Sequence, residues 1–165
     1  HSLLFKGIKM SYKNSKSYVT RMIELNLSSD QSITSSSATL LDFDTIRGDF
    51  GHGVSLVSGG NGRIRLSANN HYYCVGFAAL DKDTNTDTYR VKVYNTSGTQ
   101  LTESQGAFQS YASFVSGVNK HYQCMNFQLL VNPTTDTDYD FKTDGETGTM
   151  KADGTSIFII EMSDA

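Results

Sequence analysis

Two short motifs in the sequence combine the residue types that bind zinc. They are His71-x-x-Cys74 and His121-x-x-Cys124, and two histidines with two cysteines are a known zinc ligand set. Both motifs lie in runs rich in aromatic and β-branched residues, which predict strands. Positions i and i+3 of a strand face opposite sides of its sheet, so the four side chains cannot converge without a bulge. We therefore expect no zinc site, with the histidines at strand entrances and the cysteines packed as small hydrophobic residues.

The same two cysteines raise the question of a disulfide. The two runs echo each other, which would place Cys74 and Cys124 on the same face of neighbouring strands. The register of those strands decides whether the Cα atoms come within bonding range. Two cysteines alone do not make a disulfide framework. We expect free thiols, and a disulfide stays open as the alternative.

An acidic run near the end of the chain is a candidate calcium site. Asp136, Asp138 and Asp140 alternate with other residues, and calcium takes several oxygen ligands. The run lacks the glycine that an EF-hand loop needs at its sixth position, where Phe141 stands. Calcium at these three aspartates is a hypothesis beside the alternative of a solvated acidic loop. We expect no other cofactor.

The sequence gives little sign of an enzyme. It has no Gly-x-Ser-x-Gly nucleophile motif. The glycine-rich stretch 58–62 is followed by an alternating strand pattern, whereas a phosphate-binding loop is followed by a helix. It therefore predicts a β-hairpin. We expect a protein that binds and does not catalyse.

Aromatic residues in a long polar segment are candidates for ligand contact. Tyr111 and Phe114 lie within residues 106–119. Loops on a rigid scaffold commonly carry binding residues, and aromatic rings supply contact area. The alternative is that these rings close one end of the fold.

Length and charge bound the classes of function. The chain has 165 residues and a net charge of −3, which suits one domain with a proper core. No basic patch typical of a nucleic-acid-binding protein is visible. No apolar run approaches the roughly 20 residues of a membrane helix. We expect neither nucleic-acid binding nor membrane insertion.

The pattern of apolar residues predicts an all-β domain. About eight to ten short antiparallel strands separated by turns, without a convincing helix, are typical of a β-sandwich or jelly roll. We place this head domain at residues 18–165. Residues 1–17 would form an N-terminal extension or a link to an upstream shaft.

Three of the expected strands are apolar on both faces, namely residues 72–80, 122–131 and 156–162. Strands 63–66 and 89–94 are apolar on one face only. An antiparallel sheet usually keeps one face polar and wet. The simplest arrangement puts the three two-faced strands in one sheet that packs on a second sheet and on neighbouring subunits. Because oligomers close by symmetry, this predicts a cyclic assembly.

The succession of these runs resembles the tumour-necrosis-factor-like jelly roll, in the style of its complement globular-head branch. The resemblance covers about residues 18–163 and rests on residues 41–44, 62–66, 70–77, 90–94, 125–131 and 156–160. The family's usual glycine is Asn70 here, and its Gly-Asp is replaced by Asn132-Pro133. These departures point to a distant, viral member. Residues 29–34 resemble the heads of phage fibres with this fold.

The resemblance implies a homotrimer with the strands that carry Tyr72 and Tyr122 near the three-fold axis, and a binding head at the end of a stalk. Strand alternation then assigns side chains to two faces. Val75, Phe77 and Ala79, with Met125, Phe127 and Leu129, are expected in the sandwich core. The expected trimer interface consists of Tyr72, Cys74, Gly76, Ala78, Tyr122, Cys124, Asn126 and Gln128.

The function that these expectations favour is receptor binding outside the cell. We expect a trimeric head that attaches a virus or phage fibre to a host-surface protein or glycan, at the virion surface. One alternative is a structural capsid decoration or a fibre-tip trimerisation domain. Another is a secreted complement-like adhesion or signalling domain. Fold by itself does not separate them.

Overall fold

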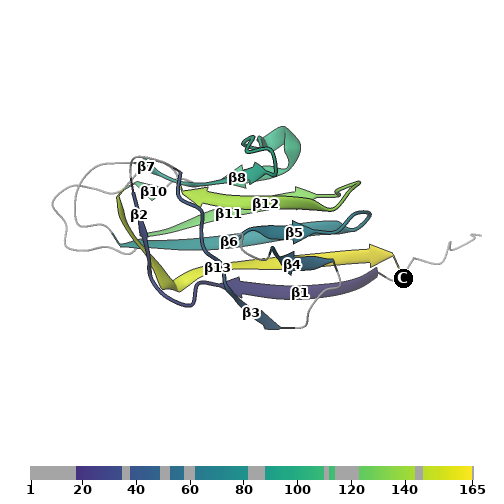
Figure 1. Cartoon of the computed structure of the whole chain (residues 1–165), viewed down its shortest axis with the longest axis horizontal. Coiled ribbons are helices and arrows are strands. Elements are labelled where there is room, and N and C mark those ends of the chain that lie inside the picture. The colour runs from purple at the N-terminus through teal and green to yellow at the C-terminus, as the bar shows by residue number, and fades with distance from the viewer. Residues whose placement is uncertain are drawn as a thin grey trace, which may run out of the picture.

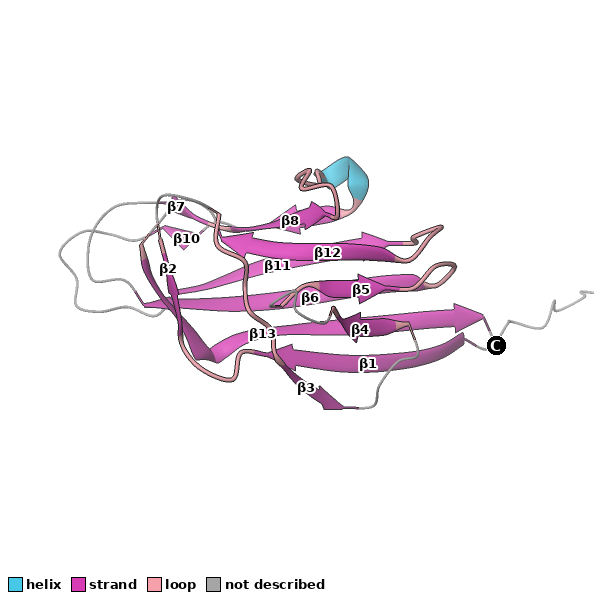
Figure 2. Ribbon diagram, viewed as in Figure 1, coloured by secondary structure: helices cyan, strands magenta, loops and turns pink. Residues whose placement is uncertain are grey.

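The structure is a computed structural model of the chain. It describes residues 18–34, 38–48, 53–57, 62–81, 88–109, 112–113, 123–143 and 147–164. Most of this described part is strand, with one short 3-10 turn, η1 (Glu103–Gln105) (Figure 2). The strands in chain order are β1 (Tyr18–Asn26), β2 (Gln31–Ile33), β3 (Thr45–Gly48), β4 (Val54–Leu56), β5 (Ile64–Leu66), β6 (His71–Asp81), β7 (Thr88–Tyr89), β8 (Val91–Asn95), β9 (Ala107–Gln109), β10 (Ala112–Ser113), β11 (Gln123–Val131), β12 (Thr137–Thr143) and β13 (Gly148–Asp164).

These strands form two main antiparallel sheets. The larger sheet has seven strands in the order β3-β1-β13-β6-β11-β9, with β2 also paired to β13. The smaller sheet has the order β4-β5-β12-β8, and a short pair joins β7 to β10. Figure 1 shows the long strands running along the long axis of the molecule. The expected all-β jelly-roll fold is confirmed.

The centre of the larger sheet is made of the three runs that are apolar on both faces. β6 lies between β13 and β11 and pairs antiparallel with both of them. These runs are separated in the chain by at least 16 residues, so their pairing depends on long-range packing. The expectation that they share one sheet is confirmed.

The core fills the space between the inner faces of the two sheets. In the smaller sheet the one-sided strands bury alternate residues, with Ile64 and Leu66 of β5 at 1% exposure and Arg65 exposed between them. Leu41 and Phe43 come from the segment before β3 and are fully buried. This alternation follows from the two-residue period of a strand.

In the structure, the inward and outward faces of β6 are the reverse of those expected from the sequence. Tyr72, Cys74 and Ala78 are at most 1% exposed and belong to the core, whereas Phe77 is 39% exposed. The reason lies opposite Gly76, which pairs directly with the fully buried Phe127 of β11. A Cβ at position 76 would lie 1.9 Å from Cζ of Phe127. The small residues of β6 therefore face inward because the ring of Phe127 occupies the space above the glycine.

Candidate functional site

The outer face of the larger sheet, which points away from the smaller sheet, is largely apolar. Residues that pair directly across a ladder project to the same side, so the register defines rows across this face. One row consists of Met22, Ile160, Tyr73 and Leu130. The next row consists of Glu24, Phe158, Val75, Gln128 and Phe108.

Exposed large hydrophobic side chains in the described part of the chain all lie on this outer face. They are Met22 at 57%, Leu130 at 53%, Phe108 at 46% and Phe77 at 39% exposure. Tyr73, Val75, Phe158 and Ile160 are half-buried between them. Contiguous apolar patches of this kind mark interaction surfaces on soluble proteins. We call this surface the apolar face.

Polar groups are sparse within the apolar face. The hydroxyl group of Tyr73 donates a hydrogen bond to Oε1 of Gln128 at 3.2 Å. Asn126 is exposed and pairs with Phe77 in the ladder. Charged residues of these rows lie toward the β3 edge of the sheet, where Glu24 of β1 pairs with Arg47 of β3. The centre of the face can therefore be covered by another apolar surface without desolvating a charge.

The expected interface residues divide between the two sides of the sheet. Asn126 and Gln128 lie on the apolar face. Tyr72, Cys74, Gly76 and Ala78 lie on the core side, so their assignment to an outer seam is wrong. Tyr122 and the side chain of Cys124 lie outside the described residues. Sequence reasoning did not assign Met22, Tyr73, Phe108 and Leu130 to the outer face, and it placed Phe77 in the core, where the structure leaves it 39% exposed. The glycine opposite Phe127 was the signal that could have indicated which face of β6 is outward.

Tyr72 faces inward because its hydroxyl group has buried partners. It donates a hydrogen bond to the carbonyl oxygen of Gly53 at 3.1 Å. Glu161, only 4% exposed, accepts hydrogen bonds from the backbone N–H of Gly53 at 3.3 Å and from Nδ2 of Asn70 at 2.9 Å. Burial raises the pKa of Tyr72. This network joins the start of β4 to β6 and β13, and it explains how a polar tip fits inside the sandwich.

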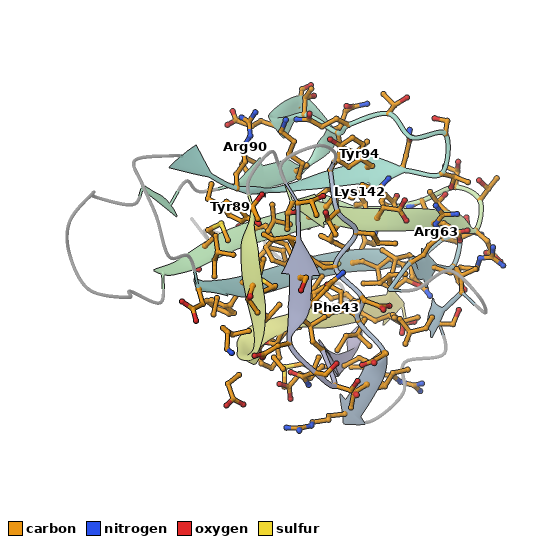
Figure 3. All side chains as sticks on the ribbon, turned by 60° about the vertical axis from the view of Figure 1, so that its left-hand side comes forward. Phe43, Arg63, Tyr89, Arg90, Tyr94 and Lys142 are labelled. Carbon is orange, nitrogen blue, oxygen red and sulfur yellow. The ribbon has the colours of Figure 1, made fainter. Side chains whose placement is uncertain are left out.

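The outer face of the smaller sheet is polar and paired. Arg63 donates two hydrogen bonds to Asp140, at 2.7 and 2.9 Å, and Arg65 donates two to Asp138, at 2.6 and 3.1 Å. Lys142 also contacts Asp140 at 3.2 Å and lies 5.0 Å from the ring centroid of Tyr94 (Figure 3). The outward faces of the two sheets therefore differ: the smaller sheet presents paired charges and the larger sheet presents apolar side chains.

The three candidate calcium ligands all accept hydrogen bonds from groups of the protein. Asp138 and Asp140 are held by arginines, and Asp136 accepts the backbone N–H of Ala68 at 3.0 Å. Within the described residues, no three histidine, cysteine, aspartate or glutamate side chains converge as a metal site. The three aspartates therefore act in this structure as acceptors for protein donors.

Asp140 gives the fold a dependence on pH. Burial raises the pKa of this carboxyl group, but hydrogen bonds from Arg63 and Lys142 stabilise its charged form and lower the pKa below the ordinary value of 3.8. A carboxyl group whose pKa is lowered by folding stabilises the fold above its ordinary pKa. That stabilisation is lost as the pH falls through the folded-state pKa.

We expect Asp140→Asn to destabilise the fold by about 2–3 kcal/mol at neutral pH, because it leaves two cations without their shared carboxylate. The gap in melting temperature between wild type and variant should narrow as the pH falls below about 4. Circular dichroism melts between pH 7 and pH 3 measure both effects. Asp153→Asn, at an exposed carboxyl group, is the matched control. A gap that stays constant down to pH 3 would contradict the role of this charge.

The His-Cys motif and the cysteine pair are separated by the strand geometry. His71 is exposed, with Nε2 at 3.4 Å from Nδ2 of Asn132, and Cys74 is buried on the opposite side of β6. Cys74 is a free thiol whose pKa is raised to about 12 by burial. It pairs with Leu129, whereas Cys124 pairs with Ala79. That offset separates the two cysteines by about 17 Å along the sheet, too far for a disulfide.

Some of the predicted residues lie outside the described part of the chain. They are the candidate ligand-binding residues Tyr111 and Phe114, the second motif's His121, and the N-terminal extension, residues 1–17. The predictions for them stay predictions. Among the residues that the structure describes, no helix has the length and apolar character needed to cross a membrane.

Comparison with solved structures decides the type of jelly roll. Murine APRIL, a jelly-roll protein of the tumour-necrosis-factor family, matches in its pH 8.5 crystal structure with a TM-score of 0.55. The match covers 87% of this chain and 99% of that chain at 11% sequence identity. The fold is the tumour-necrosis-factor-like jelly roll. Crystal structures of the same protein at pH 5.0 and pH 8.0 match over the same shares of both chains, with TM-scores of 0.55 and 0.54 at 10% and 11% identity.

The match at this level of identity shows the fold alone. No family model matches the sequence, and no curated protein matches it. The fold resemblance inferred from residues 18–163 is therefore supported by structure and not by sequence similarity. The function must be argued from the surfaces of this chain.

Proposed function

We propose that the chain is a trimeric receptor-binding head that acts outside the cell. The observation that carries the proposal is the apolar face, which holds the exposed large hydrophobic residues of the described chain. A sheet face of this composition needs a cover, and a cyclic assembly of identical subunits supplies one. The resemblance of the sequence to a trimeric fold family favours three subunits.

Assembly through the apolar face leaves other surfaces for a partner. The polar outer face of the smaller sheet points away from the apolar face. Loops carried on a rigid scaffold are the common place for recognition. Assembly on the face and recognition at the ends together describe an attachment head. Our finer hypothesis is that this head attaches a virus or phage fibre to a host-surface molecule.

Two measurements test the proposal. Light scattering of the purified chain should give three times its mass of 18.2 kDa. Labelled head should then bind to host cells in a saturable way that excess unlabelled head displaces. A stable monomer would refute the assembly, and a trimer that binds no cell would refute the receptor-binding role in favour of a purely structural trimer.

A further inference from the structure

A polar hollow of about 440 Å³ lies at the β3 edge of the larger sheet, where Arg47 continues the row that contains Glu24. It is formed where β1 ends, β3 begins and β13 bends, and these three segments lie together in Figure 1. Asn26 pairs with Thr45 on one side and with Ser156 on the other. The hollow thus has a fixed place in the sheet, because strands define two of its walls.

A β-bulge in β13 forms the third wall. The register of β13 against β6 shifts between Lys151 and Ser156, and Gly154 adopts a φ of +100°. Thr155 is fully buried, and its Oγ1 accepts the backbone N–H of Ala79 at 3.0 Å. Asp30 accepts the backbone N–H of Ala152 at 2.9 Å. These bonds hold the bulge open, and bulges commonly re-aim side chains at functional sites.

The hollow contains a buried donor that lacks an acceptor. Nδ2 of Asn26 is inaccessible and has no hydrogen-bond partner among the described residues. Ser28 and Thr45 donate their hydroxyl hydrogens to Asp44, and neither hydroxyl oxygen accepts a hydrogen bond from this amide. Buried polar groups are nearly always paired, so an orphaned amide beside a hollow indicates a missing acceptor from water or ligand.

Two charged side chains with no bonded partner face the same hollow. Arg47 and Asp153 both line it, both are exposed, and within the described residues neither makes an ion pair or hydrogen bond. Glu24 lies directly across the β1–β3 ladder from Arg47. The hollow therefore presents donors from Arg47 and Asn26 and an acceptor from Asp153.

We infer that this hollow binds a neutral sugar ring, a hexose or an N-acetylhexosamine, of a cell-surface glycan. Each sugar hydroxyl group both donates and accepts, so neighbouring hydroxyl groups satisfy a guanidinium and a carboxylate at once. An acetamido carbonyl or a ring hydroxyl oxygen would accept from Nδ2 of Asn26. The volume lies within the range of small-ligand sites.

The surrounding charges favour a neutral ring over an acidic one. Asp153 lines the hollow with Arg47, Glu24 pairs with Arg47 across the ladder, and Asp44 precedes the lining residue Thr45. A ligand carboxylate would be repelled by these groups. None of the described residues that line the hollow is aromatic and could stack on a sugar ring, so we expect one site to bind weakly. Three copies on one head would raise the overall affinity through multivalency. The inference rests on the proposed receptor-binding function, because it names the ligand class of that head.

The test is an NMR titration of the ¹⁵N-labelled full chain with glucose, galactose, N-acetylglucosamine, N-acetylgalactosamine and sialic acid, up to tens of millimolar. We expect at least one neutral sugar to shift the amide signals of residues 26–28, 45–47 and 152–154. Asp153→Asn and Arg47→Gln should each weaken this binding at least about tenfold. Glu103→Gln, at an exposed carboxyl group on η1, should leave it unchanged.

Absence of shifts with every neutral sugar, or equal shifts in Asp153→Asn, would overturn the site. Selective binding of sialic acid would overturn the choice of a neutral ring. The proposed receptor-binding function can fail independently of the sugar site. A head that binds sugar at these residues but does not bind cells would refute receptor binding and support the sugar site. A head that binds cells equally well with Asp153→Asn and Arg47→Gln would keep attachment and refute the site.

Discussion

The double variant Phe77→Arg, Leu130→Arg should be a folded monomer, in contrast to the trimer that we propose for the wild-type chain. Both side chains are exposed on the apolar face, at 39% and 53%, so the single subunit tolerates the change. In the assembly each arginine would be buried without a partner, which costs about 4 kcal/mol or more. That corresponds to at least a thousandfold weaker association, roughly, at each seam.

Light scattering measures the loss of assembly, and circular dichroism shows that the fold persists. Ser55→Arg is the matched control, because Ser55 is exposed on β4 of the smaller sheet and pairs there with Arg65. This control should remain a trimer. If the double variant also stays trimeric, the apolar face is not the seam, and the proposed assembly fails with it.

Gly76→Ala should destabilise the fold by about 1–3 kcal/mol through overpacking. The added Cβ would lie 1.9 Å from Cζ and 2.0 Å from Cε2 of Phe127, whose ring also packs on Phe141 with centroids 5.2 Å apart. The ring cannot move away without disturbing the core. Phe127→Ala alone should cost about 3–5 kcal/mol by leaving a cavity.

The double variant Gly76→Ala, Phe127→Ala should cost less than the sum of its two single variants, by about 0.5–3 kcal/mol, because the clash disappears with the ring. Urea unfolding at one protein concentration measures all of these values. Gly98→Ala supplies the control. Gly98 has a φ of +77° and no neighbour near its would-be Cβ, so its cost is backbone strain. The cost of Gly98→Ala should therefore simply add to that of Phe127→Ala in the double variant. If Gly98→Ala and Gly76→Ala showed the same coupling energy with Phe127→Ala, the packing explanation would be contradicted.

Sequence patterns gave the class of fold because the burial of strands follows their two-residue period. The alternation of Ile64, Arg65 and Leu66 is reproduced as buried, exposed and buried in β5. The glycine-rich stretch before it predicted a hairpin, and β4 and β5 pair as one. The apolar character of both faces of β6 was sufficient to predict its central place in a sheet that needs a second cover.

The choice between the two faces of β6 could not be made in this way. Val75 and Phe77 are larger than Cys74, Gly76 and Ala78, and size alone argues that the larger residues point inward. The opposite holds because Phe127 of the neighbouring strand fills the inner volume. Packing density is a property of both strands together, so one strand read alone assigns the faces incorrectly.

The candidate metal ligands and the hollow also could not be predicted from one segment of the sequence alone. Asp138 and Asp140 alternate in the sequence as calcium ligands could, but β5 lies beside β12 and brings Arg65 and Arg63 to them. The hollow at Asn26, Arg47 and Asp153 draws on three strands and a bulge, and no spacing in the chain signals it. Sites that depend on side chains from distant segments appear only when those segments have been placed.

The sequence by itself determined that His71 and Cys74 make no common site, that the chain folds as an all-β jelly roll, and that one sheet has two apolar faces. Local alternation suffices for each of these, because it depends on strand geometry alone. Tertiary structure decided which residues of that sheet remain exposed, through register and the ring of Phe127 over Gly76. It also decided that Cys74 and Cys124 lie too far apart for a disulfide, and that Asp138 and Asp140 accept hydrogen bonds from arginines. Strand order and register, which set both outcomes, depend on the packing of the whole core.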